Sequence, residues 1–194
     1  MIKAVVFDCF GVLLADVLRT RINEVELTDK ETAQHMRDVL TQLDYRMITE
    51  QEMAEQLGPL MGVAPGDVHK LLVDGEVKNQ SLWEYIQTLK GTYRLAVLSN
   101  VRGRYWLDDR LGKDDLDALF DVVVASGDVG FVKPHPEIYE LVVRELGVEP
   151  DEAVMIDDIE GHCDGARHVG MQAIHFTSTQ QCVADLKKLF DEQG

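Results

Sequence analysis

The chain has 194 residues, of which 45% are hydrophobic and only five are proline, a composition typical of a compact folded protein. This length fits one domain, or a core domain that carries a modest insertion. The formal net charge of −16 creates a field that repels phosphate backbones and anionic membrane surfaces, which disfavours nucleic-acid and membrane partners. A small anionic substrate would need a local cation to overcome that field.

Two further features bear on the location of the protein. The N-terminal residues MIKAVVFDC lack the features of a signal peptide, and no apolar segment approaches the roughly 20 residues that span a bilayer. The three cysteines, Cys9, Cys163 and Cys182, have neither metal-type nor redox-type spacing. We therefore expect three reduced thiols in a cytoplasmic protein.

The first predicted element is an apolar strand that ends in a carboxylate. In the stretch VVFDCFGVLL, residues Val5 to Phe7 indicate a buried strand, and Asp8 follows directly. Burial of an unpaired carboxylate is costly, so Asp8 needs a partner or a chemical task. It could be a turn or helix-capping carboxylate, or part of a functional site.

Residues 16–90 show helical periodicity and no strand pattern. Within them, Thr49 stands three residues before Glu52, which is the signature of a capping box at the start of a helix. We expect an all-helical domain over 16–90, inserted after the first strand. The remaining parts of the chain, 1–15 and 91–194, would then form one discontinuous domain.

Four more short apolar runs predict strands that are covered on both faces, as in parallel sheets. They span residues 94–99, 121–126, 153–157 and 172–176. Helical patterns lie between them, for example PEIYELVVREL with Gly147 as its C-terminal stop. This alternation predicts an α/β fold with a doubly wound parallel sheet, and it places His175 in the last strand as a packed core histidine.

Polar residues follow the predicted strands at their carboxyl ends, which is where open parallel sheets bind ligands. They are Asp8, Ser99, Asn100, Lys133, Asp157 and Asp158. Taken singly, Ser99 and Asn100 could form a turn, one of the paired aspartates could cap a helix, and Lys133 could be a surface lysine. Taken together, they predict one cluster at one edge of the sheet.

These residue types favour chemistry on a small phosphorylated molecule. Asp8 and Asp158 can hold Mg²⁺, which accepts one or two carboxylates together with water and substrate phosphate. The Ser99 hydroxyl and backbone donors at Ser99 and Asn100 can bind phosphate oxygens, and Lys133 supplies positive charge. The Asp8 carboxylate could then attack phosphorus and form an acyl phosphate that water cleaves.

At this point the sequence resembles the haloacid dehalogenase-like (HAD) superfamily of hydrolases over nearly its whole length. The motifs that carry the resemblance are, in chain order, VVFDCFGVLL, the LSN that contains Ser99, GFVKPHPEIY around Lys133, and MIDDIEGHCDGARHVGMQAIHF. The helical insertion resembles the α-helical cap of the subgroup that includes epoxide-hydrolase N-terminal phosphatases and sugar-phosphate phosphatases. The resemblance implies a Rossmann-like core with a cap inserted after the first strand.

The resemblance also implies roles for single residues. Asp8 matches the nucleophile and a metal ligand, and Phe10 offers its backbone carbonyl to Mg²⁺. Lys133 matches the charge-balancing catalytic lysine and Asp158 the acidic metal ligand. Ser99 matches the phosphate-binding hydroxyl, with Asn100 beside it. Asp157 and His162 would support the metal ligands from behind, and Asp157 is also an alternative ligand.

Two residues depart from the family pattern. Phe10 stands where the phosphatases usually carry the aspartate that protonates the leaving oxygen and then activates water, a loss that could make a phosphatase slow. His162 stands four residues after Asp158, where the family commonly has Asp or Asn, and it could take over proton transfer or only pack.

Three functions therefore stay open. The first is a Mg²⁺-dependent hydrolase of a small phosphorylated metabolite that works through an aspartyl-phosphate. The second is a haloacid dehalogenase, which the aromatic Phe10 favours and the acidic pair Asp157–Asp158 opposes. The third is a catalytically impaired member that binds a phosphorylated ligand or a partner protein.

Overall fold

A computed structural model describes residues 1–191 of the chain, which divide into two compact units. The first unit, here called the sheet unit, combines Met1–Leu14 with the chain from Lys78 onward. The second, here called the helical unit, is Ala15–Val77. Each unit has its own hydrophobic core, so each is described by itself.

The sheet unit is built on one parallel sheet of five strands. They are β1 Ala4–Phe7, β2 Arg94–Ser99, β3 Val122–Ala125, β4 Ala153–Asp157 and β5 Gln172–His175. Their order across the sheet is β3-β2-β1-β4-β5, and every neighbouring pair is parallel. The predicted doubly wound α/β class is confirmed, and all five apolar runs form the strands expected of them.

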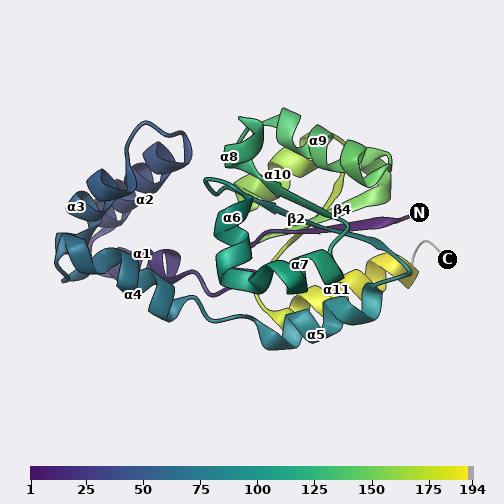
Figure 1. The fold of residues 1–194 in the computed structure, drawn as a ribbon, viewed down its shortest axis with the longest axis horizontal. Helices are drawn as coiled ribbons and strands as arrows, with labels where there is room; N and C mark the ends of the chain where they lie inside the picture. Colours follow the sequence, from purple (N-terminus) through teal and green to yellow (C-terminus); the bar gives the residue numbers. More distant parts are fainter. Residues whose placement is uncertain (192–194) are drawn as a thin grey trace. The chain divides into compact units, whose positions relative to one another are not determined.

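Helices cover both faces of this sheet, as Figure 1 shows. The helices of the sheet unit are α5 Gln80–Leu89, α6 Arg104–Leu107, α7 Lys113–Leu119, α8 Ser126–Val129, α9 Pro136–Leu146, α10 Glu160–His168 and α11 Thr179–Asp191. Val5 and Phe7 pack in one core with α5, α7 and α11, whereas Ala4 and Val6 pack in the other with α9 and α10. Because both faces are buried, the strands read as continuous apolar runs rather than alternating ones.

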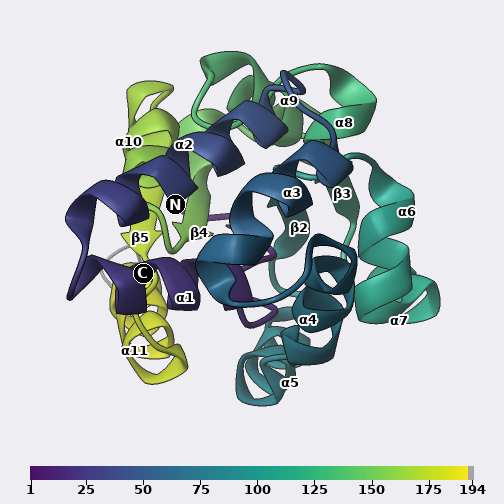
Figure 2. The same cartoon turned by 90° about the vertical axis from the view of Figure 1, so that its left-hand side faces the viewer.

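The helical unit contains four α-helices, which are labelled in Figure 2. They are α1 Val17–Glu26, α2 Lys30–Asp44, α3 Glu50–Met61 and α4 Val68–Gly75. Met36, Leu57 and Val68 are fully buried in its separate core. The expected capping box at Thr49 and Glu52 is present, since the side chain of each bonds the backbone N–H of the other.

The boundary of the helical unit differs from the expected one. Residues 78–90, which we expected in the insertion, belong to the sheet unit. The reason is α5, whose Trp83 and Ile86 are buried in the sheet unit's core, with the Trp83 ring edge-on to Phe120 at 5.7 Å between centroids. The amphipathic pattern of α5 predicts a helix but does not reveal which core the apolar side faces.

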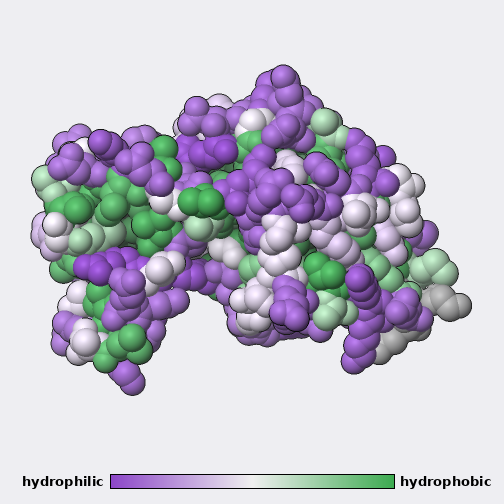
Figure 3. All heavy atoms as spheres, turned by 90° about the horizontal axis from the view of Figure 1, so that it is seen from below, coloured by the Kyte–Doolittle hydropathy of each residue, from purple (hydrophilic) through white to green (hydrophobic). Residues whose placement is uncertain are grey.

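Within residues 1–191, no helix combines the length and the apolar character needed to cross a lipid bilayer. Large hydrophobic side chains do reach the surface, and those of the helical unit include Leu27, Met47, Leu71, Val73 and Val77. Figure 3 shows hydrophobic residues in patches on the visible face of this unit, between hydrophilic ones.

We predict that Thr49→Ala destabilises α3 by about 1 kcal/mol, because the first turn of the helix loses the hydroxyl that accepts from the Glu52 N–H. Hydrogen exchange of the α3 amides should become faster by a corresponding factor. Thr41→Ala is the matched control, since Thr41 lies inside α2 with its hydroxyl bonded to the Arg37 carbonyl and alanine is the better helix former there. Equal exchange in both variants would contradict a capping role.

Candidate active site

The strand register brings two carboxylates to the same level at the carboxyl edge of the sheet. Phe7 of β1 pairs with Ile156 of β4, so Asp8 and Asp157, the next residues, leave the paired region side by side. The Asp8 N–H donates to the Ile156 carbonyl at 2.9 Å and fixes this level. Ser99, the buried last residue of β2, ends the neighbouring strand.

A buried ammonium group joins the two carboxylates. Lys133 Nζ lies 2.8 Å from Asp8 Oδ1 and 2.6 Å from Asp157 Oδ2. The Lys133 and Asp157 side chains have no exposed surface and that of Asp8 has 8%. The sequence reasoning placed these residues at one edge of the sheet, and the structure brings them into direct contact.

The backbone of Lys133 is held in place by Asn100. The Lys133 N–H donates to Asn100 Oδ1 at 2.8 Å, and Asn100 Nδ2 donates to the Lys133 carbonyl at 3.0 Å. On the other side of the loop, α10 packs so closely that a Cβ on Gly165 would lie 2.8 Å from the Pro134 carbonyl oxygen. The Asn100 side chain is therefore committed to positioning the lysine, and any phosphate contact from residue 100 must come from its backbone.

The Asp157 carboxylate is fully occupied by neighbours. Besides Lys133, it accepts from the Ile159 N–H at 2.9 Å, and its Oδ1 lies 3.1 Å from His162 Nδ1. The backbone of His162 is fixed in turn, since the Tyr139 hydroxyl donates to the His162 carbonyl at 2.8 Å. His162 thus sits on the Asp157 side of Asp8, and Tyr139 is a support that the sequence analysis did not identify.

Asp158 lies against the loop that follows β1. A Cβ added to Gly11, which has φ +80°, would lie 2.3 Å from Asp158 Oδ2, so glycine is required for this close approach. His175 supports the same segment through its Nε2, 3.0 Å from the Asp158 carbonyl, and its Nδ1, 3.3 Å from Glu160 Oε2. The expectation of a core histidine is wrong, because the His175 side chain is 42% exposed at the end of an edge strand.

The protonation of Asp8 is set by competing effects. The pKa of Asp8 is raised to about 7, chiefly by burial and further by the charges of Asp157 and Asp158, while Lys133 acts in the opposite direction. Burial raises the pKa of Asp157 too, but Lys133 and His162 outweigh it, and the net pKa is well below the usual range. The two carboxylates likewise outweigh burial at Lys133 and hold its pKa above the usual value. Asp157 and Lys133 therefore form a fixed ion pair, and Asp8 is the group that can change its state.

The donor set of the cluster suits a hard divalent cation. The three carboxylates of Asp8, Asp157 and Asp158 are gathered near one ammonium, that of Lys133. Ligand atoms of Asp8, Asp157 and His162 lie within 4.8 Å of one another, but the Asp157 oxygens already accept from Lys133, Ile159 and His162. The carboxylates left for a cation are those of Asp8, through Oδ2, and Asp158.

Phe10 points into an aromatic layer rather than into this charged cluster. Its ring meets Trp106 edge-on at 5.8 Å between centroids, and the Arg110 guanidinium lies 3.1 Å above the Trp106 ring. Arg110 comes from Asp108–Gly112, a turn of π-helix after α6, and its side chain is nearly buried. The sequence raised Phe10 as an anomaly, but it gave no sign of the Trp106 and Arg110 stack.

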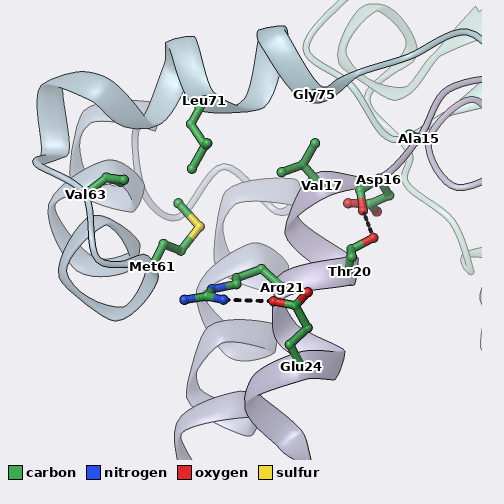
Figure 4. Close-up of a pocket in the computed structure, with 10 residues that line it drawn as sticks. All are labelled: Ala15, Asp16, Val17, Thr20, Arg21, Glu24, Met61, Val63, Leu71 and Gly75. Atoms are coloured by element: carbon green, nitrogen blue, oxygen red, sulfur yellow. Dashed lines mark hydrogen bonds and ion pairs between the residues drawn. The ribbon is translucent and has the colours of Figure 1, made fainter.

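A separate pocket of about 510 Å³ lies within the helical unit. Figure 4 shows Leu71, Met61, Val63 and Val17 around an apolar space, with Arg21 and Glu24 paired along α1. The distance between Arg21 Nη1 and Glu24 Oε2 in that pair is 2.8 Å. The lining suits the organic part of a small molecule more than a second reaction centre.

Comparison with curated proteins finds relatives that match part of the chain. Bifunctional epoxide hydrolase 2 of Rattus norvegicus is 34% identical over 95 residues, which cover 45% of this chain and 17% of the rat protein. Pyrophosphatase PpaX of Bacillus cereus (strain AH820) is 33% identical over 105 residues, which cover 54% of this chain and 47% of that protein. The matched part therefore spans less than half the length of both relatives.

Among solved structures, a HAD family enzyme of Bacteroides thetaiotaomicron, an aspartate-to-alanine mutant in complex with magnesium and inorganic phosphate, has a TM-score of 0.66. It is 20% identical, and the match covers 91% of this chain and 95% of that one, a likeness that shows the fold. The family model of the haloacid dehalogenase-like hydrolases matches residues 2–170. Sheet order, converging motifs and this match agree, and the chain belongs to the haloacid dehalogenase-like hydrolases.

Proposed function

We propose that this hydrolase is a Mg²⁺-dependent phosphatase of a small phosphorylated metabolite, with Asp8 as its nucleophile. The observation that carries the proposal is the state of Asp8, a nearly buried carboxylate at a strand end, paired with Lys133 and neighboured by Asp158. A structural carboxylate would be fully paired, whereas both polar contacts made by the Asp8 side chain within the described residues fall on Oδ1. Oδ2 is thereby left for a substrate or a cation.

The residues that would hold the cation are Asp8, Asp158 and the main-chain carbonyl of Phe10. The fit is supported by the gathering of carboxylate oxygens, which are ligands that Mg²⁺ accepts, and by Gly11, which leaves the space that the Asp158 carboxylate needs. A bound Mg²⁺ would neutralise phosphate charge and orient the phosphoryl group toward Asp8. The magnesium and phosphate bound to the Bacteroides enzyme are consistent with this assignment.

The chain's own residues would then perform the reaction as follows. The ionised Asp8 carboxylate attacks phosphorus in line and forms an aspartyl-phosphate, which water hydrolyses. Lys133, held by Asp157 and by the Asn100 amide, balances charge beside the reacting carboxylate. Ser99, at the end of the adjacent strand, donates its hydroxyl to a phosphate oxygen.

We assign the role of a substrate-selecting cap to the helical unit. It follows β1 in the chain and spans Ala15–Val77. It carries an apolar pocket, and the residues that line this pocket all belong to the unit itself. The names of the relatives, a pyrophosphatase and a bifunctional epoxide hydrolase, describe those proteins and leave the substrate here to be tested.

A haloacid dehalogenase is the second candidate, because Phe10 supplies an aromatic in place of an acid and halide leaves without a proton. The charge of the site opposes it. A haloacid is itself a carboxylate, and it would enter a cluster in which three carboxylates already lie near one ammonium. The phosphatase is therefore the function that the geometry supports best.

We predict that the wild-type chain releases phosphate from some small phosphate compounds only when Mg²⁺ is present. Asp8→Asn should lower this turnover at least about 10³-fold, because the amide cannot act as the nucleophile. Phosphate release from a substrate panel, with and without Mg²⁺, is the measurement, and Asp114→Asn on the exposed face of α7 is the control. Equal activity in the two variants would show that the reaction does not use Asp8.

We predict that Gly11→Ala weakens Mg²⁺ binding at least about tenfold, since the new Cβ would occupy the place of the Asp158 carboxylate. Gly62→Ala is a matched control, because Gly62 has nearly the same φ, +76°, with nothing within 4 Å of its Cβ position. Both variants should lose stability from a strained backbone, but calorimetric titration should show weaker Mg²⁺ binding in Gly11→Ala alone. Unchanged Mg²⁺ affinity in Gly11→Ala would remove Asp158 from the ligand set.

We predict that Mg²⁺ affinity rises with pH and levels off above about 7. Burial raises the pKa of Asp8 to about 7, so below this pH a proton occupies the carboxylate and must leave before the cation binds. The dissociation constant should change by about tenfold per pH unit on the acidic side, where one proton is released per ion. Titration between pH 5.5 and 8 is the measurement. In Asp8→Asn this pH dependence should disappear, and a flat wild-type profile would contradict the assignment of Asp8 as a ligand.

A further inference from the structure

The sheet unit gathers charged groups around Asp8. A separate requirement of the reaction is a group that can protonate the leaving oxygen. In an in-line displacement the leaving oxygen departs on the side of phosphorus opposite to Asp8. An alkoxide leaves poorly unless an acid protonates it, and such help is typically worth about 10²–10⁴-fold in rate. The proton donors near Asp8 therefore limit which substrates can react.

Within the described part of the sheet unit, the donors around Asp8 are already engaged. Lys133 Nζ is held between two carboxylates. The Tyr139 hydroxyl donates to the His162 carbonyl, and the Cys163 thiol donates to the Asp157 carbonyl at 3.5 Å. Each of these groups is buried and faces inward to the protein, so none is placed to meet a leaving oxygen.

His162 is the remaining candidate, but its Nδ1 is engaged by Asp157. That nitrogen is 3.1 Å from Asp157 Oδ1, and a His162 ring nitrogen lies within 4.8 Å of a carboxylate oxygen of Asp8. The imidazole is thus held against the carboxylates on the side of the attacking group. This contact suits a residue that positions Asp157 more than one that replaces the acid absent at residue 10.

The layer around residue 10 offers no exchangeable proton either. The Phe10 ring has none, it meets Trp106 edge-on, and the Trp106 ring lies under the Arg110 guanidinium. An indole N–H is a donor only, and a guanidinium keeps its protons at any ordinary pH. This layer can exclude water and hold an apolar wall, but it cannot give a proton to a leaving group and later take one from water.

We propose that the natural substrate is a phosphoanhydride, either between two phosphates or between phosphate and a carboxylate, rather than an alkyl phosphate ester. The proposal rests on the phosphatase function proposed above. The bond from Asp8 to phosphorus forms, and the bridging P–O bond breaks with its electron pair on the leaving phosphate or carboxylate. Water then cleaves the aspartyl-phosphate to phosphate and regenerates Asp8, and the product phosphate takes up the proton of the water.

The stability of the leaving anion distinguishes these two classes of substrate. A phosphate monoester has a second pKa of about 6, so a phosphate leaves as a stable anion, whereas an alcohol is about as weak an acid as water, with a pKa of about 15.7. An anhydride consequently reacts without the acid that this site lacks, and an alkyl ester does not.

The test is the dependence of kcat/KM on the leaving group, measured on the full chain with Mg²⁺. A series of aryl phosphates with graded phenol pKa, pyrophosphate, acetyl phosphate and an alkyl phosphate are the substrates. We expect kcat/KM to fall several-fold per unit of leaving-group pKa, and an anhydride to exceed the alkyl ester at least about 10²-fold. A shallow dependence would overturn the proposal, because it would reveal an acid that protonates the leaving group.

Two variants at residue 10 sharpen the test. Phe10→Asp introduces an acid and should narrow the ratio of anhydride to alkyl ester by about 10²-fold, while Phe10→Asn, which has nearly the same shape but no acid, should not. If neither variant folds, the wild-type slope still decides. If no compound of the series shows Mg²⁺-dependent turnover in the wild type, the phosphatase function itself fails, a result distinct from turnover with a shallow slope.

Discussion

The ammonium group of Lys133 is the constraint on which the site depends. It is buried between Asp8, which follows β1, and Asp157, which ends β4. Two adjacent carboxylates at this depth would repel each other and lose their hydration, and removing one partner of a buried ion pair typically costs about 3–5 kcal/mol. The strand register places the two carboxylates side by side, and the Lys133 ammonium offsets the repulsion between them.

The position of this lysine comes from groups that take no part in chemistry. Asn100 uses both ends of its amide on the Lys133 backbone, and Gly165 lets α10 lie against Pro134. The loop after β2 and the helix after β4 thus fix the lysine from two directions. Because α10 also carries His162, the same close packing sets the partner of the second Asp157 oxygen.

The strands and their polar ends could be predicted from the sequence, because both appear as patterns within a few residues. Burial on both faces gives a continuous apolar run, and the carboxylate follows that run directly. The end of the helical unit could not, since the pattern of α5 is the same whether Trp83 packs on a helical core or on a sheet. The error at His175 has a similar origin. Its place in an edge strand, and its bond to the Asp158 carbonyl, depend on strand order, which no local pattern encodes.

The partners of each site residue also come from distant parts of the chain, so no local pattern predicts them. The sequence brings Asp8, Lys133 and Asp157 to one edge, but it does not indicate that Asp157 is saturated while Asp8 keeps one oxygen open. That asymmetry separates a structural carboxylate from a reactive one, and it arises from a loop N–H and an imidazole that only the fold brings near. The structure therefore distinguishes Asp8 from Asp157, whereas the sequence alone does not.

The charges of the cluster make a cation and a phosphate depend on each other. A phosphate dianion would enter a cluster of three carboxylates and one ammonium, inside a chain whose net charge is −16. A divalent cation would offset this repulsion, and burial strengthens both the repulsion without the cation and the attraction with it. The layer of Phe10, Trp106 and Arg110 contributes no carboxylic acid to the site. In the proposed reaction, the charged cluster would bind and attack phosphate, and this layer would give the departing group no proton.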